Sequence, residues 1–319
     1  MHPAAPLHLL DLPLELNARI AEHIHASESL PFACTSKWCL KAVKTAHPRA
    51  MRTTMQSMCR SVALFEWARK KPNPLPWVYQ LMNAAAAVGN IHTVCSLFFG
   101  GMKPKRKTLT CATRNGHLVV AQFLQYVGCP LDGGVCSSAA AGGHLEVLMW
   151  ARQNGCPWDA DTCSGAAEGG HLDCLRYAHE NGCTWDEETC ERAALSGHLD
   201  CLKYAHENGC PWNEHTCALA ATGGHLDCLR YARKNGCDWD EETCEDAAMY
   251  GEFDILKWVH ENGCPWDKGT CTLAAAEGHL DVLKWARKNG CPWDKSACMN
   301  AAKRKGHQDV LAWIRTQPD

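Results

Sequence analysis

Residues 182–208 read Gly182-Cys-Thr-Trp-Asp-Glu-Glu-Thr-Cys-Glu-Arg-Ala-Ala-Leu-Ser-Gly-His-Leu-Asp-Cys-Leu-Lys-Tyr-Ala-His-Glu-Asn208, and the chain repeats this pattern. A fixed period of this size is the signature of stacked supersecondary units, so the pattern predicts a solenoid. Eight intervals separate nine marks, and all are 27 residues except the last, which is 28. The marks are Gly89-Asn90, Gly116-His117, Gly143-His144, Gly170-His171, Gly197-His198, Gly224-His225, Gly251-Glu252, Gly278-His279 and Gly306-His307.

The first half of the repeat predicts a short helix. Asp186 is followed by two glutamates, and acids at this place satisfy the free N–H groups and the dipole of a helix N-terminus. Cys190, Ala193 and Ala194 then have the i, i+3, i+4 spacing of a buried stripe, and the two alanines let a neighbouring helix approach closely. Gly197 ends this helix, because glycine adopts positive φ without a Cβ clash.

The second half predicts another helix, from His198 to Asn208. Leu199, Leu202 and Ala205 lie on one face of it, and Gly209 closes it as a C-terminal glycine. The loop that follows, Gly-Cys-Pro-Trp-Asp in several repeats, is too short for a projecting hairpin. We therefore expect an almost entirely helical array.

The motif Thr-Cys-x-x-Ala-Ala-x-x-Gly-His-Leu-Asp-x-Leu-x-Tyr-Ala-x-x-Asn-Gly-Cys resembles the ankyrin repeat, over about residues 81–315. In the early repeat, Thr108-Leu109 has the leucine that the family places where later repeats have cysteine. The family repeat has 33 residues, so a 27-residue unit lacks most of the β-finger. The resemblance implies an all-α solenoid of stacked helix pairs with a shortened β-finger, nine repeats over residues 80–319, and a protein partner on its concave face.

The N-terminal residues 1–50 resemble an F-box. Leu12, Pro13 and Leu16 belong to a Leu-Pro-x-Glu-Leu motif, isoleucines follow at four-residue spacing, and Ser36-Lys37-Trp38 departs from the usual ending. The resemblance implies binding to a Skp1-like adaptor, and an equally simple interpretation is a helical cap for the array. Residues 51–79 are a degenerate repeat or linker that contains three prolines. The scaffold-binding residues that the resemblance implies are Leu12, Pro13, Leu16, Ile20, Ile24 and Trp38.

Composition narrows the class of protein. The formal net charge of −3 gives no general attraction to nucleic acid or to an anionic membrane, and no run is long and apolar enough for a membrane span. The N-terminus has no basic region of a signal peptide, so the 22 cysteines indicate reduced packing residues in a cytoplasmic or nuclear protein. The basic run Lys103-Pro-Lys-Arg-Lys107 is a nuclear-localisation patch or a solvated loop.

Conspicuous side chains follow the repeat and are therefore expected to be structural. His171 with Cys174 has zinc-ligand character, but Cys174 is replaced by Val147 and Val282 in other repeats, as a packing position would be. A disulfide ladder or a metal- or redox-responsive cysteine array is the weaker alternative. The histidines are expected to bond backbone or to cap the second helix. Two aromatic ladders are expected to form the contacts between repeats: Trp158, Trp185, Trp212, Trp239, Trp266, Trp293, and Trp150, Tyr177, Tyr204, Tyr231, Trp258, Trp285.

Function should reside in positions that differ between repeats, because the fixed positions are occupied by folding. No phosphate loop, carboxylate pair or nucleophile–base set stands apart from the repeat, so we expect no enzyme, metal or cofactor. The leading hypothesis is a monomeric substrate adaptor of a Skp1–cullin-type ubiquitin ligase, similar to proteins of giant DNA viruses and protists and acting in a host cell if viral; the alternative is a plain scaffold. The predicted partner-binding residues are Glu191, Arg192, Leu195, Leu219, Met249, Tyr250 and Leu273.

Overall fold

The computed structural model describes residues 78–99 and 102–318. The F-box-like segment, with Leu12, Pro13, Leu16, Ile20, Ile24 and Trp38, lies outside them. The described residues form helices and no strand, which confirms the all-α expectation and the loss of the β-finger. They divide into two compact units, one ending at Trp158 and the other beginning at Asp159.

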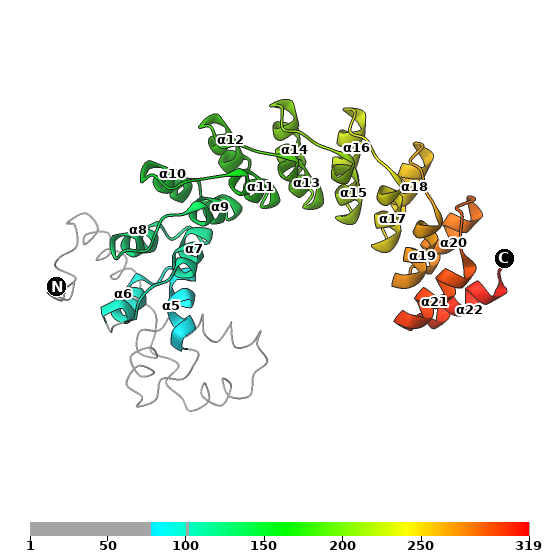
Figure 1. Cartoon of the computed structure of the whole chain (residues 1–319), viewed down its shortest axis with the longest axis horizontal. Coiled ribbons are helices and arrows are strands. Elements are labelled where there is room, and N and C mark those ends of the chain that lie inside the picture. The colour runs from blue at the N-terminus through cyan, green and yellow to red at the C-terminus, as the bar shows by residue number, and fades with distance from the viewer. Residues whose placement is uncertain (1–77, 100–101, 319) are drawn as a thin grey trace, which may run out of the picture. The chain divides into compact units, whose positions relative to one another are not determined.

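The helices come in pairs that follow the repeat (Figure 1). The first unit contains α5 (Val78–Ala87), α6 (Ile91–Phe99), α7 (Arg106–Arg114), α8 (Leu118–Tyr126), α9 (Gly133–Ala141) and α10 (Leu145–Gln153). The second contains α11 (Ala160–Glu168), α12 (Leu172–Glu180), α13 (Glu187–Leu195), α14 (Leu199–Glu207), α15 (Glu214–Thr222), α16 (Leu226–Lys234), α17 (Glu241–Met249), α18 (Phe253–Glu261), α19 (Lys268–Glu277), α20 (Leu280–Lys288), α21 (Lys295–Lys305) and α22 (Gln308–Thr316).

The pair α13 and α14 shows why this sequence forms helices. Cys190, Ala193 and Ala194 of α13 are completely buried, as are Leu202 and Ala205 of α14. Extended backbone at Asp186 begins α13, although its carboxylate makes no capping hydrogen bond. The equivalent carboxylates of Asp240, Asp267 and Asp294 do accept one from a backbone N–H. The predicted N-cap position is therefore confirmed, but a hydrogen bond from backbone N–H to the cap carboxylate is present only at Asp240, Asp267 and Asp294 of these four.

The small buried residues determine how the pairs stack. In the second unit, α11, α13, α15, α17, α19 and α21 each pack against the next, while the second helices contact one another much less. Alanine and cysteine on the first helices permit this close approach. The row of first helices is therefore the concave side of the unit (Figure 1).

The repeated histidines link each pair to the preceding one. The Nε2 atom of His117 lies 3.1 Å from the carbonyl oxygen of Ala87, and that of His279 lies 3.1 Å from the carbonyl oxygen of Met249. Both carbonyls lie at the end of the preceding first helix. Both histidines occupy the N-cap position of their own helices without a side-chain capping bond. For His117 and His279 the expected backbone bond is therefore confirmed, and the expected side-chain cap is wrong.

The tryptophans of the loops bridge consecutive second helices. The ring of Trp185 stacks on His179 of α12, with centroids 3.6 Å apart, and meets the edge of Tyr204 of α14 at 6.2 Å. Trp212 repeats the arrangement with His206 and Tyr231. These tryptophans are half-buried, so they connect repeats as predicted but lie at the edge of the core.

The cysteines of the described residues are free thiols, and all but Cys111 are buried. Six loop cysteines donate their S–H to the carbonyl at the N-cap of the preceding first helix; Cys210 Sγ, for example, lies 3.1 Å from the Asp186 oxygen. The six are Cys156, Cys183, Cys210, Cys237, Cys264 and Cys291. The contact with the Cys183 thiol, together with burial, raises the pKa of Cys163. Burial raises the pKa of Cys201 to about 12. The thiols therefore occupy buried positions, as packing residues would.

Candidate protein-binding face

The candidate site is the surface of the first helices in the second unit. Their buried stripe faces the core, which leaves the residues beside each Cys and Ala pair at the surface. Two cross-helix links show which of these residues face one another. Arg192 of α13 lies 3.9 Å from Glu168 at the end of α11, and the Thr222 hydroxyl at the end of α15 donates to Asp246 of α17 at 2.7 Å. Both links join the last residue of one first helix to the sixth of the next.

Between the other neighbouring first helices, α13 with α15 and α17 with α19, the same two positions carry apolar side chains. One period after Glu168 and Arg192 come Leu195 and Leu219, on α13 and α15. One period after Thr222 and Asp246 come Met249 and Leu273, on α17 and α19. All four apolar side chains are partly exposed. Polar and apolar cross-helix pairs therefore alternate along the row of first helices.

Six of the seven partner-binding residues predicted from sequence lie on this row. Arg192 hydrogen-bonds to Glu188 one turn earlier, at 2.9 and 3.1 Å, which holds its guanidinium over α13. Glu191 is partly exposed beside it. The seventh residue, Tyr250, follows the last residue of α17 and exposes 51% of its surface. The equivalent position holds Gly223 in the preceding repeat and Glu277 in the next.

The charge of this face differs from that of the second helices. Helices α13, α15 and α17 carry eight carboxylates and only one guanidinium, that of Arg192. The intervening second helices α14, α16 and α18 carry five carboxylates and five lysine or arginine side chains. The part of the first-helix face that α13, α15 and α17 form is therefore negative, although the net charge of the whole chain is small. At the end of the row, α21 carries four lysine or arginine side chains and no carboxylate.

Burial, together with neighbouring carboxylates, raises two pKa values on α17. Burial raises the pKa of Glu245 to about 7, and the nearby carboxylates of Asp267 and Asp246 add to the shift. Burial also raises the pKa of Asp246, while its hydrogen bond from Thr222 acts in the opposite direction. The Glu245 carboxylate occupies the space where a side chain would stand at Gly269. A cationic group near α17 would relieve this repulsion.

The partner-binding residues predicted from the sequence did not include Glu168, Thr222, Asp246 or Glu245, although Glu245 and Asp246 are among the positions that vary between repeats. The signal that could have found them is an offset of 24 residues, which separates the two partners of each cross-helix link. Comparison at a 27-residue period shows only equivalent positions. It therefore identifies the variable residues without showing which of them face each other.

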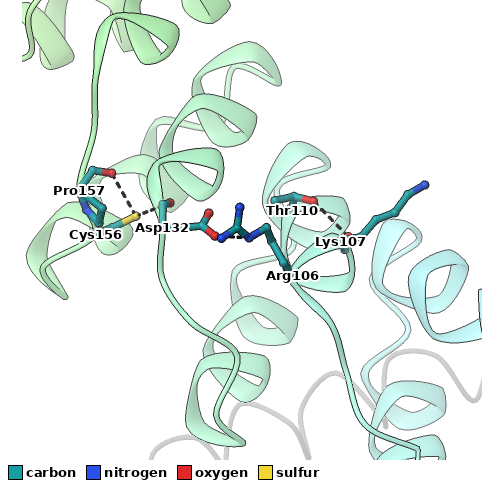
Figure 2. Close-up of polar contacts among 6 residues, drawn as sticks. All are labelled: Arg106, Lys107, Thr110, Asp132, Cys156 and Pro157. Atoms are coloured by element: carbon teal, nitrogen blue, oxygen red, sulfur yellow. Dashed lines mark hydrogen bonds and ion pairs between the residues drawn. The ribbon is translucent and has the colours of Figure 1, made fainter.

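The basic run Lys103–Lys107 lies in the first unit. Figure 2 shows two of its residues, Arg106 and Lys107. Lys103, Lys105, Arg106 and Lys107 are exposed, and the Arg106 guanidinium forms an ion pair with Asp132 before α9. The Lys107 carbonyl accepts a hydrogen bond from the Thr110 hydroxyl at 3.1 Å. Cys156 Sγ donates to the Asp132 carbonyl at 3.0 Å. Arg106 thus has a structural partner, and nuclear localisation by this run stays a prediction.

Two further properties concern all the described residues. Within residues 78–99 and 102–318, no group of three or more His, Cys, Asp or Glu side chains is arranged to hold a metal ion. Across the same ranges, no helix has both the length and the apolar character to span a membrane.

Helix pairs that stack with their first helices side by side are the arrangement of ankyrin repeats. The fold is ankyrin-like. A solved structure similar to it is the ankyrin repeat domain of human ASB11, with a TM-score of 0.45 and 18% sequence identity, covering 58% of this chain and 99% of that one. No protein-family model matches the chain, and no curated protein matches it.

Proposed function

We propose that the chain is a non-catalytic recognition module that binds a protein on the first-helix face of residues 159–319. The observation that carries this proposal is the alternation of polar and apolar cross-helix pairs on that face. Apolar side chains that remain partly exposed in a folded unit gain burial when a partner covers them, and interface energy concentrates in such residues. The exposed ring of Tyr250 at one edge of the face adds a third apolar contact.

The finer proposal is that residues 12–38 connect this module to a Skp1–cullin-type ubiquitin ligase. It is supported by the Leu-Pro-x-Glu-Leu motif at Leu12–Leu16, the spaced Ile20 and Ile24, and Trp38. In this proposal, the repeat array would select the substrate and the ligase would supply the ubiquitin chemistry. A plain scaffold without a ligase is the alternative.

One capture experiment tests both levels. The full chain is immobilised as wild type, as Leu12→Ser with Pro13→Ser, and as Leu219→Ala with Tyr250→Ala. The adaptor proposal expects Skp1 with the wild type and the face variant but not with the Leu12 and Pro13 variant. The recognition proposal expects a second protein to be captured by the wild type and by the Leu12 and Pro13 variant, but not by the Leu219 and Tyr250 variant. Absence of Skp1 from all three samples would leave only the scaffold function. Equal capture of the second protein by all three chains would contradict the proposed role of the first-helix face.

A further inference from the structure

The distance between the two apolar pairs predicts how far apart the apolar side chains of a ligand must lie. The Leu195–Leu219 and Met249–Leu273 pairs are separated by two helix spacings along the row of first helices. Packed helices lie about 8–10 Å apart, so the two pairs lie about 16–20 Å apart. The Thr222–Asp246 link lies between them. A single ligand that contacts both pairs must therefore carry two apolar side chains at that separation, with a polar group between.

The charges in the middle of the face predict the charge of the ligand's central polar group. The middle of the face presents Asp246, Glu245 and Glu242, and the pKa values of the first two are raised by burial and by neighbouring carboxylates. Of these three carboxylates, Glu242 lies beside a histidine: its Oε2 atom is 3.3 Å from Nδ1 of His215. No lysine or arginine occurs on α15 or α17. The complementary ligand is cationic at its centre.

The backbone of the ligand is constrained by what the face offers. An extended segment would need a partner for its N–H and C=O groups, and the described residues contain no strand edge that could pair with it. A helix satisfies its own backbone groups. With a rise of about 1.5 Å per residue, apolar side chains eleven residues apart lie about 16.5 Å apart on one helical face. Residues four and seven positions after the first apolar side chain point to the same side.

We infer that the first-helix face of α13, α15, α17 and α19 binds a basic amphipathic helix whose two apolar anchors are eleven residues apart and flank lysine or arginine. This inference rests on the proposed recognition function and adds the chemistry of the partner. Leu195 with Leu219 receives one anchor, Met249 with Leu273 receives the other, and the central cation meets Asp246 and Glu245. The two apolar pairs hold the ends of the ligand, and the carboxylates select its charge.

The test uses labelled 20-residue helical peptides in an alanine and glutamine host. The first has leucine at positions 5 and 16 and lysine at positions 9 and 12, so that the leucines are eleven apart. The second exchanges the leucines and lysines, which keeps the composition and the net charge. The third replaces the lysines of the first with glutamate. Fluorescence anisotropy with the full chain gives the dissociation constants.

Two protein variants accompany the peptides. Leu219→Ala with Leu273→Ala shortens one residue of each apolar pair. The matched control, Leu199→Ala with Leu280→Ala, shortens two partly exposed leucines at the start of the second helices α14 and α20. Circular dichroism and thermal unfolding establish that both variants fold as the wild type does.

The inference expects the first peptide to bind at least tenfold more tightly than the other two. It expects the Leu219 and Leu273 variant to lose about tenfold in affinity and the Leu199 and Leu280 control to lose less than twofold. Equal binding of the first and second peptides, no binding of either, or equal loss in both protein variants overturns the inference. If the peptides fail while the chain still captures a protein through Tyr250 and Leu219, the proposed function stands and only the basic-helix partner is removed.

Discussion

The His225 imidazole packs against the Cα of Gly197 one repeat earlier, so closely that a Cβ at Gly197 would lie 2.5 Å from the imidazole Cε1. Gly197 also has φ of +75°, in the left-handed region. Gly197 is thus needed both for its own turn and for the His225 side chain of the next repeat. Gly209, with φ of +84°, has open space around the same position.

Comparison of these two glycines separates the cost of the clash with His225 from the cost of placing alanine at positive φ. Gly209→Ala should lower the free energy of unfolding by about 1 kcal/mol, because alanine is strained at positive φ. Gly197→Ala should cost about 1–3 kcal/mol more, since the imidazole must move and its contact is lost. Urea denaturation of the two variants gives the difference. Equal losses would mean that the histidine contact contributes nothing to stability.

The stacking of His206 on Trp212, at 3.7 Å, predicts which substitutions are tolerated. In another repeat, Arg233 takes the equivalent position, lies 4.4 Å over Trp239 and donates to the Cys237 carbonyl at 3.1 Å. His206→Arg should therefore change the free energy of unfolding by less than about 0.5 kcal/mol. His206→Ala should lower it by about 1 kcal/mol, because the stack is lost. If both variants lose the same stability, the stack is not what holds this position.

Thiol reactivity distinguishes packing cysteines from a redox or metal array. Burial raises the pKa of Cys174 and of Cys228 to about 11, so these two thiols are almost entirely protonated at pH 8. Ellman's reagent should react quickly with Cys111 and slowly with the buried thiols, at the rate of unfolding. Cys111→Ser should remove one fast equivalent. Rapid modification of the buried thiols in native protein, or stoichiometric zinc in metal analysis, would favour the cysteine-array hypothesis instead.

Glu245 predicts a pH dependence of stability on α17. Its pKa is raised from 4.5 to about 7 on folding, so the folded chain binds this proton more tightly than the unfolded chain does. The contribution to stability is fully present below about pH 4.5 and is lost as the pH rises through about 7. Glu245→Gln should therefore be more stable than wild type at pH 8, and its advantage should shrink at pH 5. Urea denaturation at both pH values checks this, with Glu214→Gln on α15 as the control; an advantage that is the same at both values would contradict it.

Much of the fold follows from the repeat, because glycine, alanine and the apolar periods act within one or two turns of chain. Gly197 ends a helix for a local reason, and Ala193 with Ala194 is buried wherever the pattern recurs. The histidine bonds depend on the neighbouring repeat, so the sequence left two roles open for these side chains. The tryptophans connect repeats as predicted, but their half-buried place at the edge of the core depends on how the repeats pack. The facing of Thr222 and Asp246 depends on how two first helices pack, which a single repeat does not encode.

The central claim is that the first-helix face of the second unit binds a protein. Its most direct measurement is the dissociation constant of the captured protein, purified, for the wild-type full chain, for Leu195→Ala with Leu219→Ala and Tyr250→Ala, and for the control Leu199→Ala with Leu280→Ala. We predict at least tenfold weaker binding for the face variant and less than twofold change for the control. Unchanged binding by the face variant, with loss of binding in the control, would contradict the claim.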